Sequence, residues 1–138
     1  MNDVERLDTA IADLQTELNR IDRIDAGRQG VGSMEDLQVL RLLHSQGPQR
    51  VGTIATMRAA GKATVSARID RLERKGLVRR DRIPGDRRGV VCALTPEGRS
   101  VAARSRKLRR RLLDAAPLGV EPARLEELVG VLRASLTP

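Results

Sequence analysis

The chain has 138 residues, 40% of them hydrophobic, and it contains no Phe, Tyr or Trp. One domain with an aliphatic core fits this length, and stacking of nucleic-acid bases on aromatic rings is excluded. The formal net charge of +8 indicates a polyanionic partner, most often nucleic acid.

Several other protein classes are disfavoured. Cys92 is the only cysteine, which excludes an internal disulfide framework and a cysteine-cluster zinc site. The only histidine, His44, has no visible second ligand or catalytic partner, and no glycine-rich phosphate loop appears, so we expect no metal, no cofactor and no enzyme activity. The N-terminal MNDVERLDTA lacks the apolar segment of a signal peptide, and no apolar run has membrane-spanning length. We therefore expect a cytoplasmic protein with no membrane partner.

The N-terminal segment carries apolar residues at alternating steps of three and four, which predicts a helix that ends near the glycines of residues 27–32. The apolar positions that we expect at a dimer interface are Val4, Leu7, Ile11, Leu14 and Leu18. Such a narrow seam needs a partner, either within the chain or on a second copy, and we favour the second copy.

Three helices are predicted between residues 33 and 75. Ser33 is an N-cap for the first helix, and Gly47-Pro48 ends it. A short helix is expected around residues 51–59 and another over residues 62–75. Two short helices joined by a tight turn, the second with a basic outer face, form a helix-turn-helix pattern.

The helix over residues 62–75 buries Val65, Ile69 and Leu72 on one face, and its opposite face begins with small residues and becomes charged. A helix that enters a DNA groove has small and polar residues at its N-terminal tip. The residues expected to contact DNA from this helix are Lys62, Ala63, Thr64, Ser66, Ala67, Arg68, Asp70, Arg71 and Arg74. The alternative is an ordinary amphipathic helix with a solvated face.

A β-hairpin is predicted next, with a turn at Ile83-Pro84-Gly85-Asp86 and a return strand over residues 89–94. Val90, Cys92 and Leu94 alternate and should share one face, where Cys92 is expected to be a small buried hydrophobe rather than a redox sensor. Clustered arginines repel one another unless an anion neutralises them, so this hairpin is interpreted as a wing that reaches the DNA minor groove. The wing residues expected at DNA are Arg82, Asp86, Arg87 and Arg88. We expect Asp86 to orient one of the tip guanidinium groups.

Three motifs follow one another at a specific spacing: LERKGLV at residues 72–78, DRR at 86–88 and LTPEG at 94–98. Together they resemble the winged helix-turn-helix of the MarR family of bacterial transcription regulators. The resemblance implies dimerisation through helices from both termini, repression by promoter blockage, and a small-molecule effector between the lobes. Many members of that family have arginine where this chain has Ala67, and a capping Ser or Thr where it has Gly61.

The C-terminal third is predicted to form two helices. Thr95 is an N-cap for a long helix that ends near Ala115 and carries a basic run, which we interpret as mostly solvated or paired with the acidic N-terminal helix. A turn over residues 117–122 leads to a last helix with an apolar stripe that includes Leu136. Its expected dimerisation residues are Leu125, Leu128 and Leu132.

The sequence therefore predicts a mainly α protein with a small β-hairpin wing, an α+β winged helix. Its parts are an N-terminal dimerisation helix (1–32), a DNA-binding lobe (33–95) and C-terminal linking and dimerisation helices (96–138), in one intertwined domain. The expected protein is a homodimeric, sequence-specific transcriptional regulator that binds a pseudo-palindromic double-stranded DNA site. We expect it to act as a repressor. The alternatives are a winged-helix RNA-binding protein and a protein-interaction module without DNA binding.

Overall fold

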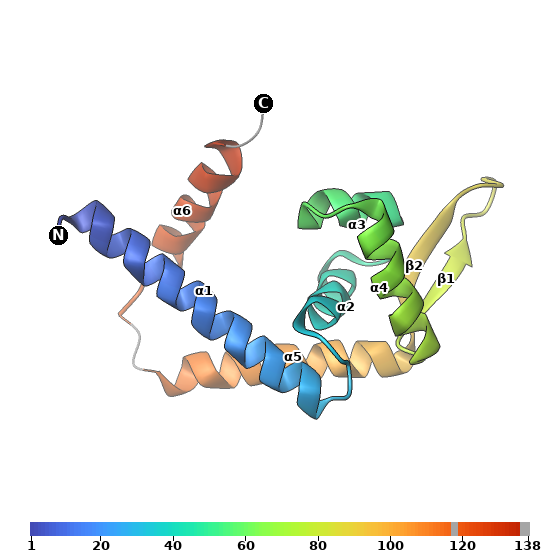
Figure 1. The fold of residues 1–138 in the computed structure, drawn as a ribbon, viewed down its shortest axis with the longest axis horizontal. Coiled ribbons are helices and arrows are strands. Elements are labelled where there is room, and N and C mark those ends of the chain that lie inside the picture. The colour runs from blue at the N-terminus through green and yellow to red at the C-terminus, as the bar shows by residue number, and fades with distance from the viewer. Residues whose placement is uncertain (117–118, 136–138) are drawn as a thin grey trace. The chain divides into compact units, whose positions relative to one another are not determined.

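The computed structural model describes residues 1–116 and 119–135, and in them the chain forms six helices and one two-stranded antiparallel sheet (Figure 1). The elements in chain order are α1 (Asp3–Arg28), α2 (Met34–Gln46), α3 (Val51–Arg58), α4 (Lys62–Arg74), β1 (Val78–Arg82), β2 (Val90–Leu94), α5 (Pro96–Ala115) and α6 (Pro122–Ser135). This confirms the predicted helical fold with one hairpin. Two compact units divide the chain, residues 1–107 and 108–138, and their boundary falls inside α5. The three-part functional division stays a prediction.

The core of the first unit is aliphatic, as the composition requires. It collects side chains from the end of α1 through the start of α5, and its largest fully buried members are Leu37, Leu40, Ile54, Ile69, Leu72, Val31, Val39, Val65 and Val78. Val65, Ile69 and Leu72, which the sequence predicts to face inward on α4, are buried, and α2 and α3 bury apolar residues beside them. The three helices of the helix-turn-helix region are therefore packed by their apolar stripes.

The predicted caps are present. The side chain of Ser33 accepts a hydrogen bond from the backbone N–H of Asp36, at 3.1 Å, and so begins α2. By contrast, the N-cap residue of α4 is Gly61, which has no side chain to cap the helix. The turn between α3 and α4 contains Ala59 at φ +49°, and the N–H groups of Ala59 and Ala60 close it on the carbonyls of Thr56 and Ala55. This is a Schellman arrangement, in which glycine is the usual residue at the left-handed position.

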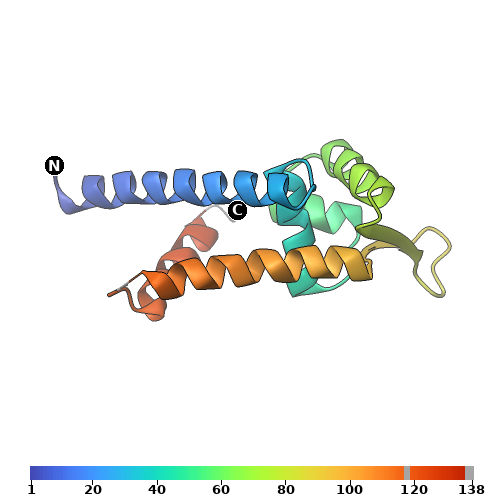
Figure 2. The same cartoon turned by 90° about the horizontal axis from the view of Figure 1, so that it is seen from below.

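In the hairpin, β1 pairs with β2 in antiparallel register from Val78 opposite Leu94 to Arg82 opposite Val90. Cys92 is buried as predicted, Leu94 is buried beside it, and Val90 is 38% exposed at the outer end of β2, where the hairpin leaves the core. Figures 1 and 2 show the hairpin beside α4 with its tip projecting away from the helices.

The LTPEG motif joins the hairpin to α5 by close backbone packing. The Thr95 hydroxyl accepts from the N–H of Gly98 (3.1 Å) and donates to the carbonyl of Gly76 (2.6 Å). A Cβ at position 98 would lie 1.9 Å from the carbonyl oxygen of Leu77, so only glycine permits this approach. The motif therefore fixes the start of α5 against residues 76–77, which follow α4.

A buried ion pair holds α1 on the rest of the first unit. Asp22, 2% exposed, accepts two hydrogen bonds from the Arg41 guanidinium of α2, at 2.6 and 2.8 Å. Gln38 donates a third bond to the same carboxylate (3.1 Å), and Arg41 also donates to the hydroxyl of Ser105 on α5 (3.2 Å). Three helices thus meet at one carboxylate–guanidinium pair.

Some basic side chains of α5 have hydrogen-bond partners within the first unit. Arg104 is exposed and donates from Nε to the side-chain oxygen of Gln29 (3.0 Å), and Arg106 donates to the carbonyl of Arg41 (3.4 Å). Lys107 is exposed to solvent.

The apolar seams predicted for both ends of the chain are exposed. Val4, Leu7 and Leu14 of α1 are 75%, 51% and 49% exposed, and Leu125 and Leu132 of α6 are 50% and 53% exposed. The remaining predicted seam residues, Ile11, Leu18 and Leu128, are partly buried. Pro117 and Leu136, also named in the sequence predictions, lie outside the described residues. Across the described ranges, no helix combines the length and apolar character that a membrane span needs.

Candidate nucleic-acid interface

One face of α4 is buried against the core, and this leaves the opposite face exposed. Val65, Ile69 and Leu72 have no exposed surface and anchor the helix to the core. The predicted contact residues on the other side are exposed at Lys62, Ala63, Thr64, Ala67, Asp70, Arg71 and Arg74, and half-buried at Ser66 and Arg68. All nine therefore have some surface available to a partner.

Arg71, however, is engaged inside the chain. Its Nε and one terminal nitrogen donate to the two oxygens of Asp36 at 3.2 and 3.1 Å, and the Asp36 side chain is only 2% exposed. The hydrogen bond to Asp36 and the attraction of its charge raise the pKa of the Arg71 guanidinium. The bidentate pair joins α4 to α2, so this guanidinium holds the helix in place.

Asp70 is also paired, with Arg80 of β1. Arg80 donates to Asp70 at 2.7 Å and to Glu73 at 3.0 Å, and so binds two carboxylates that lie about one turn apart on α4. Burial lowers the pKa of the Arg80 guanidinium, but its bonds to Asp70 and Glu73 outweigh this effect and raise it. The hairpin therefore supplies one positive charge that the two carboxylates share.

The wing tip, residues 83–89, is organised by Asp86. The N–H of Ile83 binds the carbonyl of Gly89 (2.9 Å), and the N–H of Asp86 binds the carbonyl of Ile83 (3.1 Å). One Asp86 oxygen accepts from the backbone N–H of Arg88 at 3.1 Å. These bonds close the turn and leave the Arg87 and Arg88 side chains exposed.

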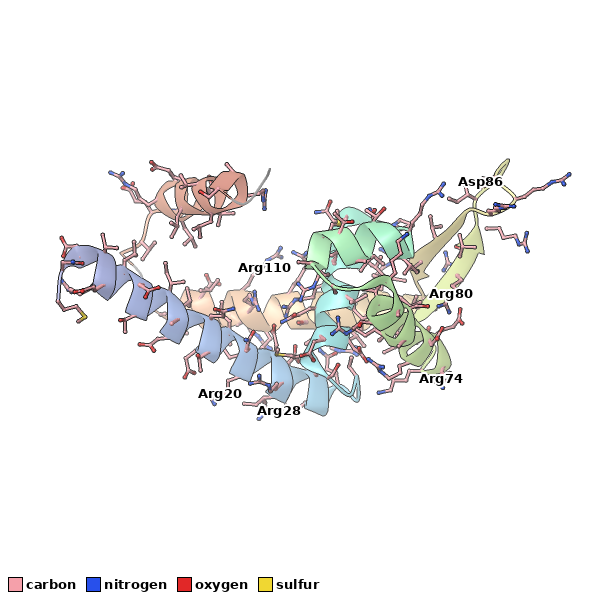
Figure 3. The ribbon with its side chains drawn as sticks, turned by 45° about the horizontal axis from the view of Figure 1, so that its top comes forward. Arg20, Arg28, Arg74, Arg80, Asp86 and Arg110 are labelled. Atoms are coloured by element: carbon pink, nitrogen blue, oxygen red, sulfur yellow. The ribbon has the colours of Figure 1, made fainter. Side chains whose placement is uncertain are left out.

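The predicted pairing of Asp86 with a tip guanidinium is wrong. The other Asp86 oxygen accepts from Arg50, the residue before α3, at 3.1 Å. The Arg88 backbone bond, and after it the bond from Arg50, lower the pKa of Asp86. Asp86 thus ties the wing to the start of α3, and Figure 3 shows it on the projecting tip.

Arg50 is the residue of this surface that sequence reasoning missed. It is 36 positions from Asp86, so no local pattern marks the pair. Arg82, by contrast, was predicted at DNA and is exposed, with only a 3.5 Å contact from its side chain to the carbonyl of Arg87. The remaining basic side chains of the surface, those of Lys62, Arg68, Arg74, Arg87 and Arg88, have no hydrogen-bond or ion-pair partner within the described residues.

The surface is polar and cationic but holds no candidate for metal chemistry. In the described part of the chain, no three His, Cys, Asp or Glu side chains are grouped so that they could hold a metal ion. Cys92 of β2 is buried, and burial raises the pKa of its thiol.

A known protein family has a model that matches the segment carrying this surface. The family model described as "MarR family" matches residues 33–90, which span α2 to the start of β2 and include the wing tip. Residues 33–90 are thus similar to the MarR family of regulators over 58 of the 138 residues of the chain. The resemblance seen in the sequence motifs is confirmed, and the α4–wing surface lies almost entirely inside the MarR segment.

Curated relatives carry matching descriptions. The HTH-type transcriptional regulator YkoM of Bacillus subtilis is 29% identical over 98 residues, which cover 71% of this chain and 64% of YkoM. YfiV of the same organism, also an HTH-type transcriptional regulator, is 36% identical over 69 residues, 50% of this chain and 43% of YfiV. The chain thus matches less than two thirds of the length of either relative.

Solved structures confirm the MarR winged-helix fold over nearly the whole chain. The transcriptional regulator BldR from Sulfolobus solfataricus has a TM-score of 0.72 at 29% identity, with 99% of this chain and 98% of BldR covered. Streptococcus pneumoniae FabT, solved in complex with DNA, has a TM-score of 0.77 at 18% identity, with 96% and 94% covered. At that lower identity the likeness to FabT shows the fold alone.

Proposed function

We propose that the chain is a sequence-specific transcriptional regulator that binds double-stranded DNA through α4 and the wing. The observation that carries this proposal is the set of basic side chains without internal partners on a MarR-type winged helix, along α4 and at the wing tip. Neighbouring carboxylates are paired within the chain: Asp70 and Glu73 share Arg80, and Asp86 binds Arg50. The surface therefore presents net positive charge to a phosphate backbone.

In this proposal α4 enters the major groove, and Arg87 and Arg88 follow the backbone into the adjacent minor groove. Relatives with the same fold support it: FabT and a Listeria monocytogenes MarR-family regulator were each solved with DNA. The function is that of a regulator and not of an enzyme, and its place is the cytoplasm.

The proposal includes a homodimer. The exposed apolar seams of α1 and α6 would otherwise leave side chains such as Val4 and Leu132 in water. Each unit carries one such seam, and a second copy is the partner that a two-fold DNA site requires. Half-sites about 10 base pairs apart, or a near multiple, follow from that symmetry. Repression by promoter blockage, and release by a small-molecule effector, are parts of the proposal that depend on the MarR resemblance.

The test is a titration of a duplex selected from a randomised DNA pool, measured by fluorescence anisotropy at several salt concentrations. We expect the Arg87→Ala/Arg88→Ala variant to bind at least about fivefold more weakly than wild type. The slope of log affinity against log salt should fall by about one unit for each lost phosphate contact, because fewer counterions are released. Thermal stability should change little, since exposed charges contribute little to folding.

The matched control is Arg6→Ala/Arg20→Ala, which removes two exposed arginines from α1. It makes the same change in net charge away from the wing and should leave the salt slope close to that of wild type. An equal loss in both variants would mean that net charge alone attracts DNA. Tighter binding to duplex RNA than to the selected DNA, or no enriched duplex at all, would refute the proposal.

A further inference from the structure

The exposed face of α4 divides into two halves with different roles. In the C-terminal half, Arg71 is bound to buried Asp36, and Asp70 and Glu73 are bound to Arg80. These three side chains hold the helix between α2 and the hairpin. Arg74, the last residue of α4, is the exposed charged side chain of that half with no hydrogen-bond or ion-pair partner in the described residues, and the remaining side chains left to contact base edges are those of the first two turns of α4.

Within these two turns, the outermost positions are alanines. At about 100° per residue, Ala63 and Ala67 both lie within about 30° of the direction opposite the buried Val65, Ile69 and Leu72 face. Both alanines are exposed. By the same count, Thr64 and Ser66 flank this line at about 75° and 85° from it, and Lys62 and Arg68 lie farther round, toward the edges of the buried face. The line that would face the floor of a groove thus presents two methyl groups.

An alanine methyl has neither a donor nor an acceptor. Placed against a guanine, adenine or cytosine edge in the major groove, it would exclude water from polar atoms and give them no partner. The C5-methyl of thymine is the one apolar group on a base edge in that groove. Four residues of helix rise by about 6 Å, and two base steps span about 7 Å, so Ala63 and Ala67 match thymines about two steps apart.

We propose that α4 selects its DNA site by contacts of the Ala63 and Ala67 methyl groups with the C5-methyl groups of two thymines in each half-site. This inference rests on the proposed DNA-binding function and adds a sequence preference to it. The two alanines are specificity-determining residues, while Lys62 and Arg68, at the edges of the exposed face, supply affinity through phosphates.

The test uses the full-length protein and the duplex obtained by selection. Each thymidine of a half-site is replaced in turn by deoxyuridine, which removes only the methyl group and keeps the base pair. We expect two positions, about two base steps apart, at which affinity falls about fourfold for each lost methyl. Ala67→Ser, which replaces the methyl with a polar group, should abolish the effect at one of these positions and keep it at the other. Ala63→Ser should show the reverse pattern.

Ala103→Ser is the matched control, since Ala103 is an exposed helical alanine of α5. It should retain the full effect at both positions. If a duplex is bound but deoxyuridine has no effect anywhere, or if its effect survives in both alanine variants, the methyl contacts are refuted while the DNA-binding function stands. If no duplex is selected, the proposed function itself fails.

Discussion

Removal of Asp22 should destabilise the first unit far more than removal of an equivalent acid on the surface of the same helix. In Asp22→Ala, the Arg41 guanidinium loses both short hydrogen bonds, at 2.6 and 2.8 Å, and keeps only the 3.2 Å bond to Ser105. The Arg41 side chain is 16% exposed, so water cannot replace the carboxylate fully. Breaking one side of a buried pair costs about 3–5 kcal/mol, and the residual exposure places the expected loss near the lower end, about 3 kcal/mol.

Glu17→Ala provides the control. Glu17 pairs with Arg20 at 3.0 Å on the same helix, but the two side chains are 58% and 62% exposed. An exposed pair of this kind contributes at most about 1 kcal/mol. The distances of the two pairs are similar, so the comparison isolates burial.

The assay is urea unfolding followed by circular dichroism, together with thermal unfolding. A loss of about 3 kcal/mol should lower the midpoint temperature by about 10 °C in a chain of this size. Replacing both partners, in Asp22→Ala/Arg41→Met, should recover part of the loss, because no unpaired charge is left buried. Equal small losses of unfolding free energy in Asp22→Ala and Glu17→Ala would refute this reasoning. So would a double variant whose loss exceeds the sum of the losses in Asp22→Ala and Arg41→Met.

Three further substitutions test the backbone and the core. Gly98→Ala should destabilise by about 3 kcal/mol or more in urea unfolding, because its Cβ would overlap the Leu77 carbonyl at 1.9 Å; a neutral result would mean that α5 moves freely against the hairpin. Ala59→Gly should stabilise by about 1 kcal/mol, since it relieves the left-handed φ of +49° in the turn before α4, and a loss of stability would contradict this account. Because burial raises the pKa of the Cys92 thiol, little thiolate is present at pH 7–8, and a thiol reagent should label the native protein much more slowly than the guanidinium-unfolded chain. Equal labelling rates would show that the thiol is accessible.

The sequence alone determined the order and bounds of the elements to within a residue or two. Periodic apolar residues, Ser33 and Thr95 caps and the Pro-Gly turn are local features whose physical effect does not depend on the rest of the fold. The absence of aromatic residues determined an aliphatic core in the same way, and the spacing of three motifs was enough to identify the MarR resemblance.

Only the tertiary structure decided which charged side chains remain available for a partner. In sequence, Arg71 looks like Arg74, yet Arg71 binds a carboxylate 35 residues away that α2 buries beside it. The same holds for Arg50, whose partner on the wing is 36 residues distant. A guanidinium has the same chemistry wherever it stands in the chain, and its role depends on which acid the packing of helices and hairpin brings within hydrogen-bonding distance. That packing distinguishes the arginines that hold the winged helix together from those left facing solvent.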